Sequence, residues 1–199
     1  PLSLAREIIK EFKQLNMHIN IYLHDQLYVE RINARAVDYA KQSGVPVFEA
    51  GDLVDFMDAP PTKILINDEP EKLDAIIDSM RKKFGHALHI TKSKPFYLEF
   101  LAKNVNKGTA VNFLMKYYRY QKEEVMAIGD APNDIEMLEA AGLGVAVNNA
   151  VPEAKAKAKW VVASNLNNGV AEALFRLLAM ENTNMDKAGI DAKKTNIYQ

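Results

Sequence analysis

The chain has 199 residues, and its 25 Lys and Arg against 26 Asp and Glu give a net charge of −1. Because the sequence has no block of like charge, we expect no nucleic-acid and no membrane partner. The absence of cysteine excludes disulfides, thiolate metal ligands and thiol nucleophiles. Apolar residues make up 48% of the chain, but no apolar run reaches the length of a bilayer span, and we expect a cytoplasmic protein with one core or two small lobes.

Helix and strand patterns are interleaved over residues 1–103. Apolar residues recur at helical spacing in three segments: 4–15, 32–44 and 73–84. Strand patterns occur at 19–23, 26–30, 45–50, 62–69, 86–92 and 95–102. We therefore expect an α+β lobe whose antiparallel sheet is covered by helices on one face.

From residue 104 the pattern changes to helices that alternate strictly with short buried strands at 124–130, 142–147 and 160–164. Such alternation is typical of a parallel sheet in an α/β fold. Periodicity is lost in residues 181–199, which are rich in Asn, Asp and Lys, and we predict a loosely docked polar tail there.

Three polar side chains follow the first of these buried strands in the segment "IGDAPNDIEML", residues 128–138. They are Asp130, Asn133 and Asp134. Ligands of open α/β sheets bind beyond the carboxyl ends of the strands. Carboxylate and amide oxygens are ligands that Mg²⁺ prefers, and a helix N-terminus favours phosphate. Helix capping explains Asp130 or Asn133 taken singly, whereas the cluster favours a metal or phosphate site.

Three segments carry a resemblance to a known family. They are "NKGTAV" from Asn106, "MAIGDAPNDIEMLEAAGLGVAVNNAVPEAKAKA" from Met126, and "SNLNNGVAEAL" from Ser164. In order and spacing they resemble the C-terminal half of the Cof-type sugar-phosphate phosphatases of the haloacid dehalogenase superfamily. The resemblance implies that residues 104–180 form the C-terminal part of a Rossmann-like parallel core. It also implies that residues 1–103 form an α+β cap domain and leaves residues 181–199 as the tail.

The resemblance implies phosphoryl transfer to an aspartate nucleophile, with Mg²⁺ as cofactor and a small phosphorylated metabolite such as a sugar phosphate as substrate. Lys107 would then lie beside the nucleophile and the phosphoryl group, and Asn133 would contact the phosphate. Asp130 would bind Mg²⁺, and Asp134 would complete and orient the metal site. Lys107, Asp130 and Asn133 are expected to converge at the carboxyl end of the strand that ends near Ile128. The alternative interpretation of Lys107 is a solvated lysine at a helix start.

The family's nucleophile lies in an Asp-x-Asp-Gly-Thr type of segment, and no two aspartates of this chain are separated by a single residue. We therefore expect no turnover by the chain alone. The alternative function is a noncatalytic binding or assembly module, or one half of a split enzyme that pairs with an N-terminal partner chain. We also predict that the strand at 125–128 lies at an open sheet edge, which a second copy of the chain could cover as a homodimer.

Overall fold

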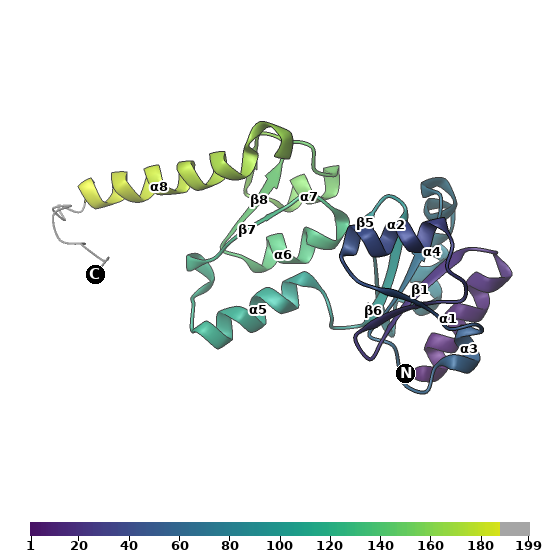
Figure 1. Ribbon diagram of the computed structural model, residues 1–199. Coiled ribbons are helices and arrows are strands. Elements are labelled where there is room, and N and C mark those ends of the chain that lie inside the picture. The colour runs from purple at the N-terminus through teal and green to yellow at the C-terminus, as the bar shows by residue number, and fades with distance from the viewer. Residues whose placement is uncertain (188–199) are drawn as a thin grey trace. The chain divides into compact units, whose positions relative to one another are not determined.

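The computed structural model describes residues 1–187 and divides them into two compact units (Figure 1). The first unit contains residues 1–110 with 131–133, and the second contains 111–130 with the chain from 134 onward. The division falls within one helix, after Ala110, and the assignment of residues 1–103 as a cap domain stays a prediction. Among the described residues, no helix combines the length and the apolar character needed to cross a membrane.

The first unit is built on a six-stranded sheet in the order β3-β2-β1-β4-β6-β5. The sheet is antiparallel except for the parallel pair of β2 and β3. Its elements are α1 (Leu2–Gln14), β1 (His18–Leu23), β2 (Gln26–Val29), α2 (Ala34–Ser43), β3 (Val47–Glu49), α3 (Leu53–Phe56), β4 (Lys63–Asn67), α4 (Pro70–Phe84), β5 (Leu88–Lys94) and β6 (Tyr97–Ala102). Every helix and strand expected in this half is present.

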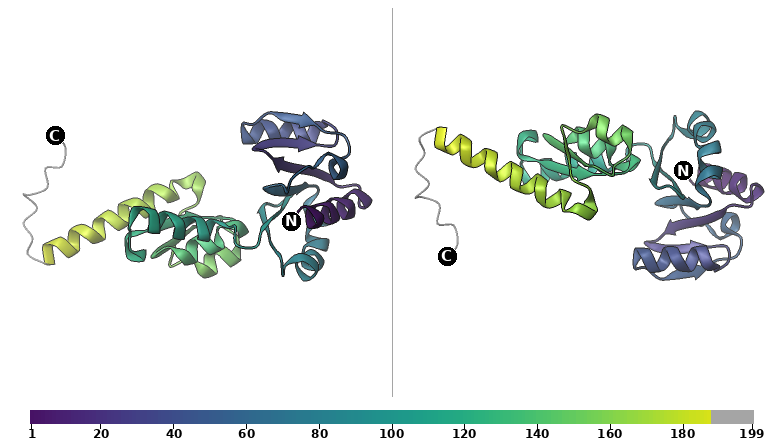
Figure 2. Two further views of the ribbon diagram at one scale, coloured as in Figure 1. Left: turned by 90° about the horizontal axis from the view of Figure 1, so that it is seen from below. Right: turned by 90° about the horizontal axis from the view of Figure 1, so that it is seen from above.

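Helices cover both faces of this sheet, so the expectation of helices on one face is wrong (Figure 2). On one face, Phe12 of α1 and Phe84 of α4 belong to the largest buried cluster, together with Ile21 of β1. On the other face, Tyr39 of α2 packs with Leu65 of β4. The reason lies in the parallel pair, because parallel neighbours need a crossover connection, and α2 carries the chain from β2 to β3 over the second face.

The hairpin between β1 and β2 turns through His24 and Asp25, whose φ angles are 51° and 59°. Two consecutive left-handed residues are typical of the type I′ turn, which matches the twist of paired strands. His24 and Asp25 therefore form the tight turn of this hairpin. On the α2 face, the hydroxyl groups of Tyr22 and Tyr39 lie 3.1 Å apart and share a hydrogen bond.

The second unit holds a three-stranded sheet in the order β7-β8-β9 with both pairs parallel, as predicted. The elements of this half are α5 (Lys107–Tyr118), η1 (Lys122–Glu124), β7 (Met126–Gly129), η2 (Pro132–Asp134), α6 (Ile135–Ala140), β8 (Leu143–Val147), α7 (Pro152–Lys157), β9 (Trp160–Val162), η3 (Asn165–Asn167) and α8 (Gly169–Lys187). Within the described residues β7 pairs with β8 alone, so it is an edge strand, as expected.

The last described element, α8, runs to Lys187 and so continues past the predicted start of the polar tail at residue 181. The remainder of that predicted tail, residues 188–199, lies outside the described residues.

Candidate functional site

The turn that follows β7 is held by a buried carboxylate. Asp134 is 4% exposed, and its Oδ2 accepts a hydrogen bond from the backbone N–H of Asp130 at 2.9 Å. Its side chain fills the space beside Gly129, where an added Cβ would lie only 2.5 Å from the Cβ of Asp134. Only glycine fits at that point, so the Gly129–Asp130 sequence and Asp134 form one interlocked turn.

Asp130 itself is fixed through its backbone while its side chain remains exposed. Its carbonyl oxygen accepts a hydrogen bond from the N–H of Val151 at 2.9 Å, at the start of α7. The turn is thus tied to α7 through this carbonyl and to Asp134 through the amide. The exposed carboxylate of Asp130 stands at the carboxyl end of a parallel strand, where α/β folds bind ligands.

The loops after β8 and β9 share this edge of the sheet. The register places Gly129 opposite Ala146 and Val147 opposite Val162. The side-chain oxygen of Asn149 accepts a hydrogen bond from the N–H of Asn165 at 3.0 Å, which joins the two loops. The segment "NLNNG" forms η3 and the start of α8.

The donor set at this turn fits part of a Mg²⁺ site. No group of three or more His, Cys, Asp or Glu side chains within residues 1–187 is placed to hold a metal ion. Asp130 offers one exposed carboxylate, and Mg²⁺ commonly takes one or two carboxylates together with water and phosphate oxygens. Oδ1 of Asn133 is buried without a hydrogen-bond partner among the described residues. The assignment of Asp134 as a second metal residue stays a prediction, since its Oδ2 already accepts the Asp130 amide.

Lys107 is the first residue of α5, which confirms its predicted position at a helix start. Asn106 caps this helix: its Oδ1 accepts the N–H of Thr109 at 2.8 Å, and the Thr109 hydroxyl accepts the N–H of Asn106 at 3.2 Å. Lys107 belongs to the first unit, whereas Asp130 and Asp134 belong to the second. Their convergence on one site therefore stays a prediction.

Residues 1–174 match the family model of the haloacid dehalogenase-like hydrolases. The chain belongs to this family. Among its relatives, the protein M6_Spy0533 of Streptococcus pyogenes, which is named a phosphatase, is 45% identical over 112 residues, which cover 56% of this chain and 42% of that protein. The phosphoglycolate phosphatase of Methanothermobacter thermautotrophicus is 40% identical over 94 residues, covering 47% of this chain and 38% of the enzyme.

The same fold is found in the crystal structure of TM0651 from Thermotoga maritima. The TM-score is 0.68 at 37% identity, with 88% of this chain and 66% of TM0651 covered. The fold class predicted from the sequence is confirmed by this similarity. The chain spans less than two thirds of the length of each of these three proteins.

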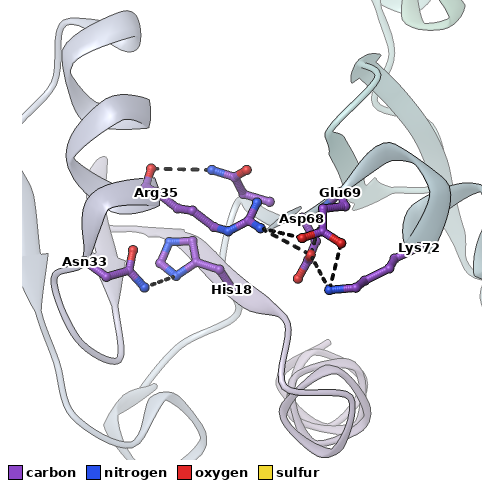
Figure 3. Close-up of polar contacts among 7 residues, drawn as sticks. His18, Asn33, Arg35, Asp68, Glu69 and Lys72 are labelled. Atoms are coloured by element: carbon purple, nitrogen blue, oxygen red, sulfur yellow. Dashed lines mark hydrogen bonds and ion pairs between the residues drawn. The ribbon is translucent and has the colours of Figure 1, made fainter.

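Sequence reasoning singled out no residue of a second polar cluster, which lies in the first unit around His18, Arg35, Asp68 and Lys72 (Figure 3). These residues are far apart in the sequence and match no motif. One local signal does exist, because α2 carries a basic residue and no acidic residue in its first turn. That composition opposes the usual preference at a helix start.

Proposed function

We propose that this chain forms the cap and the C-terminal core part of a Mg²⁺-dependent phosphatase of small phosphorylated metabolites such as sugar phosphates. The observation that carries the proposal is the interlocked turn, in which the buried Asp134 fixes the backbone of the exposed Asp130 at the end of β7. Membership of the haloacid dehalogenase-like hydrolases supports it. The phosphoglycolate phosphatase relative acts on a substrate of this class.

Each residue of the proposed site has one task. A bound Mg²⁺ supplies positive charge that offsets the charge on the phosphoryl oxygens. Asp130 holds the metal with its exposed carboxylate, and Asp134 positions Asp130 through the backbone. The side-chain amide of Asn133 donates to a phosphate oxygen. Lys107 places its ammonium group beside the phosphoryl group and the nucleophile.

The attacking group must come from outside the described turn. The 199 residues contain no pair of aspartates in the family's Asp-x-Asp spacing. We infer that an aspartate on a further segment completes the site and that the chain alone has no turnover. We expect the assembled enzyme to act in the cytoplasm.

The test compares the 199-residue chain with a version extended at its N-terminus by a strand that carries the Asp-x-Asp segment. Only the extended version should hydrolyse p-nitrophenyl phosphate, and only with Mg²⁺ present. Asp130→Asn should abolish its turnover, whereas Asp78→Asn on the exposed face of α4 should not change it. An extended version that binds Mg²⁺ and folds but shows no hydrolysis would contradict the proposed activity.

The single-sided pairing of β7 favours a second candidate function, which is assembly with another strand. The strand that pairs with β7 would come from an N-terminal partner chain of a split enzyme or from a second copy of this chain. Mixing the chain with candidate N-terminal segments and finding neither binding nor recovered hydrolysis would exclude the split enzyme.

A further inference from the structure

An open hollow of about 700 Å³ lies at one end of the six-stranded sheet, where β1 begins and β4 ends. Its volume falls within the range of sites for small molecules. Four basic and three acidic side chains line it, together with His18. It contains none of Lys107, Asp130, Asn133 and Asp134, so the proposed function makes no use of it.

A second hollow of the first unit lies at the other end of β1. Pro1 and Val105 line this second hollow, which also contains Thr62. Thr62 donates its backbone N–H to the carbonyl of Tyr22, at the end of β1 opposite to His18.

A buried carboxylate organises the basic groups on one wall. Asp68 is 4% exposed, and its Oδ1 lies 3.4 Å from the guanidinium of Arg35 and 3.3 Å from the ammonium of Lys72 (Figure 3). The same oxygen accepts the N–H of Glu69 at 2.8 Å. Because one oxygen serves three donors and the two cationic contacts are long, Arg35 keeps N–H donors for a further partner.

The start of α2 adds positive potential to this wall. Asn33 caps the helix, and the first turn holds Arg35 but no acidic residue. Arg31 also lines the hollow; it is exposed and forms no ion pair with any residue of the described chain. A helix N-terminus flanked by two arginines attracts an anion through both its amides and its side chains.

His18 provides an independent indication that a polar partner is missing. Oδ1 of Asn33 accepts the N–H of Ala36 at 3.0 Å, so the amide nitrogen of Asn33 faces Nδ1 of His18, 3.1 Å away. Nδ1 therefore accepts this bond, and the proton of the neutral ring resides on Nε2. Nε2 is buried without a partner within hydrogen-bond geometry in residues 1–187. The amide of Asn20, fully buried two residues along β1, is a neighbouring polar group, and its interaction with the imidazole raises the pKa of His18.

The opposite wall carries one basic and two acidic side chains. The ammonium of Lys13 lies 2.5 Å from Glu30 and 2.7 Å from Asp52, and these hydrogen bonds raise the pKa of Lys13. On the first wall, Arg35 and Lys72 also lie 3.8 Å and 3.1 Å from the carboxylate of Glu69, so the basic group there that has no ion pair within residues 1–187 is Arg31 (Figure 3). The opposite wall offers carboxylate oxygens that can accept hydroxyl groups.

We propose that this hollow binds a small polar metabolite through an oxyanion group, a phosphate or a carboxylate, held by Arg31, Arg35 and the first-turn amides of α2. The charges of Lys72 and Arg35 face the anion, and Asp68 keeps these two side chains in place. Phosphate and carboxylate present the same oxygen chemistry to an arginine fork.

The test is a titration of the ¹⁵N-labelled 199-residue chain, followed by NMR. Inorganic phosphate and malonate are the two probes, and sodium chloride of equal ionic strength is the control. Saturable shifts are expected at the amides of Ala34 and Arg35 and at Nε–H of Arg35. The probe that gives the tighter binding identifies the preferred oxyanion.

Arg31→Ala should weaken binding at least about tenfold, the effect of losing one charge-assisted hydrogen bond. Because Arg31 has no partner among the described residues, this change leaves the fold intact. Arg35→Gln should weaken binding further, and Arg81→Gln, on the C-terminal part of α4 beside Asp78, is the matched control without effect. Shifts that sodium chloride reproduces, or that survive Arg31→Ala unchanged, overturn the proposal. Phosphate shifts confined to residues 129–134 overturn it as well.

Discussion

The carboxylate of Asp134 accepts the backbone N–H of Asp130 at 2.9 Å, so a buried acid fixes the residue that the proposed site needs most. Asp134→Ala leaves this amide without its acceptor and should lower the free energy of unfolding by about 1–3 kcal/mol. Asp134→Asn keeps an oxygen at the same position and should cost less. Urea unfolding followed by the fluorescence of Trp160, the single tryptophan, measures the second unit. Equal losses for the two variants would contradict a role of this hydrogen bond.

The first unit should lose stability in mild acid through His18. The pKa of this imidazole lies below its usual 6.5. Burial is the largest cause of this shift, and the positive charge of Arg35 lowers the pKa further. The unfolded chain then binds a proton at a higher pH than the folded chain. The contribution of the neutral His18 to the free energy of unfolding is therefore fully present above about pH 6.5 and is lost as the pH falls toward the pKa of the folded state. Denaturant unfolding by circular dichroism at several pH values should show this loss, and His18→Gln should remove that part of it. An NMR titration of His18 at or above pH 6.5 would refute the account.

A loss of stability in alkali is expected from Tyr22. Burial first, and then the hydrogen bond to Tyr39, raise the pKa of Tyr22 from 10.0 to about 12. The folded state favours the neutral phenol, so its contribution is present below pH 10 and is lost as the pH rises toward 12. Difference absorbance of tyrosinate should show a late-titrating component that disappears in Tyr22→Phe. Tyr117→Phe, at a tyrosine of α5 that is 69% exposed, is the control.

The purified chain should not hydrolyse phosphate esters. Positive charge from Lys107 and Mg²⁺ lowers the barrier only when a nucleophile attacks, and the Asp-x-Asp segment is absent from the 199 residues. Phosphate release from a panel of sugar phosphates should equal the rate without protein. Mg²⁺-dependent release that Asp130→Ala abolishes would show that another group of the chain attacks.

Self-association should cover the edge of β7. The strand pairs on one side only within the described residues, and unpaired backbone groups favour addition of another strand. Light scattering at micromolar concentration should detect a dimer, and Met126→Glu in β7 should dissociate it. Glu123→Lys, an exposed charge change in η1, serves as the control. A well-folded monomer would disprove this account of the edge.

Periodicity in the sequence predicted the strands and helices of both units because each element buries one face. Alternation around Ile19 and Ile21 identified β1, and the apolar face with Leu73 and Ile77 identified α4. The position of α2 on the second face could not be predicted, since an apolar stripe does not specify which side of a sheet it covers. That side is set by the crossover to β3, a strand of only three residues.

The candidate residues at the β7 turn were predictable because they are adjacent in sequence and follow a buried strand. The burial of Asp134 was not, since aspartates at helix starts are usually exposed. The only sequence signal of the hollow in the first unit was the basic first turn of α2, because Lys13, Arg35 and Lys72 come from separate elements and meet only through the fold.

Between Val29 and Lys63 the chain passes through α2, adds β3 beside β2 and returns through α3 to the other side of β1. Residues 30–62 therefore form one continuous insertion between two strands that are both anchored to β1, and its buried residues Tyr39, Leu53 and Met57 pack against the sheet. Arg31, Arg35 and Asp52 all lie on this insertion. Ligand recognition in the hollow can thus change through the exposed residues of one continuous segment, while the buried residues of that segment keep their packing on the sheet.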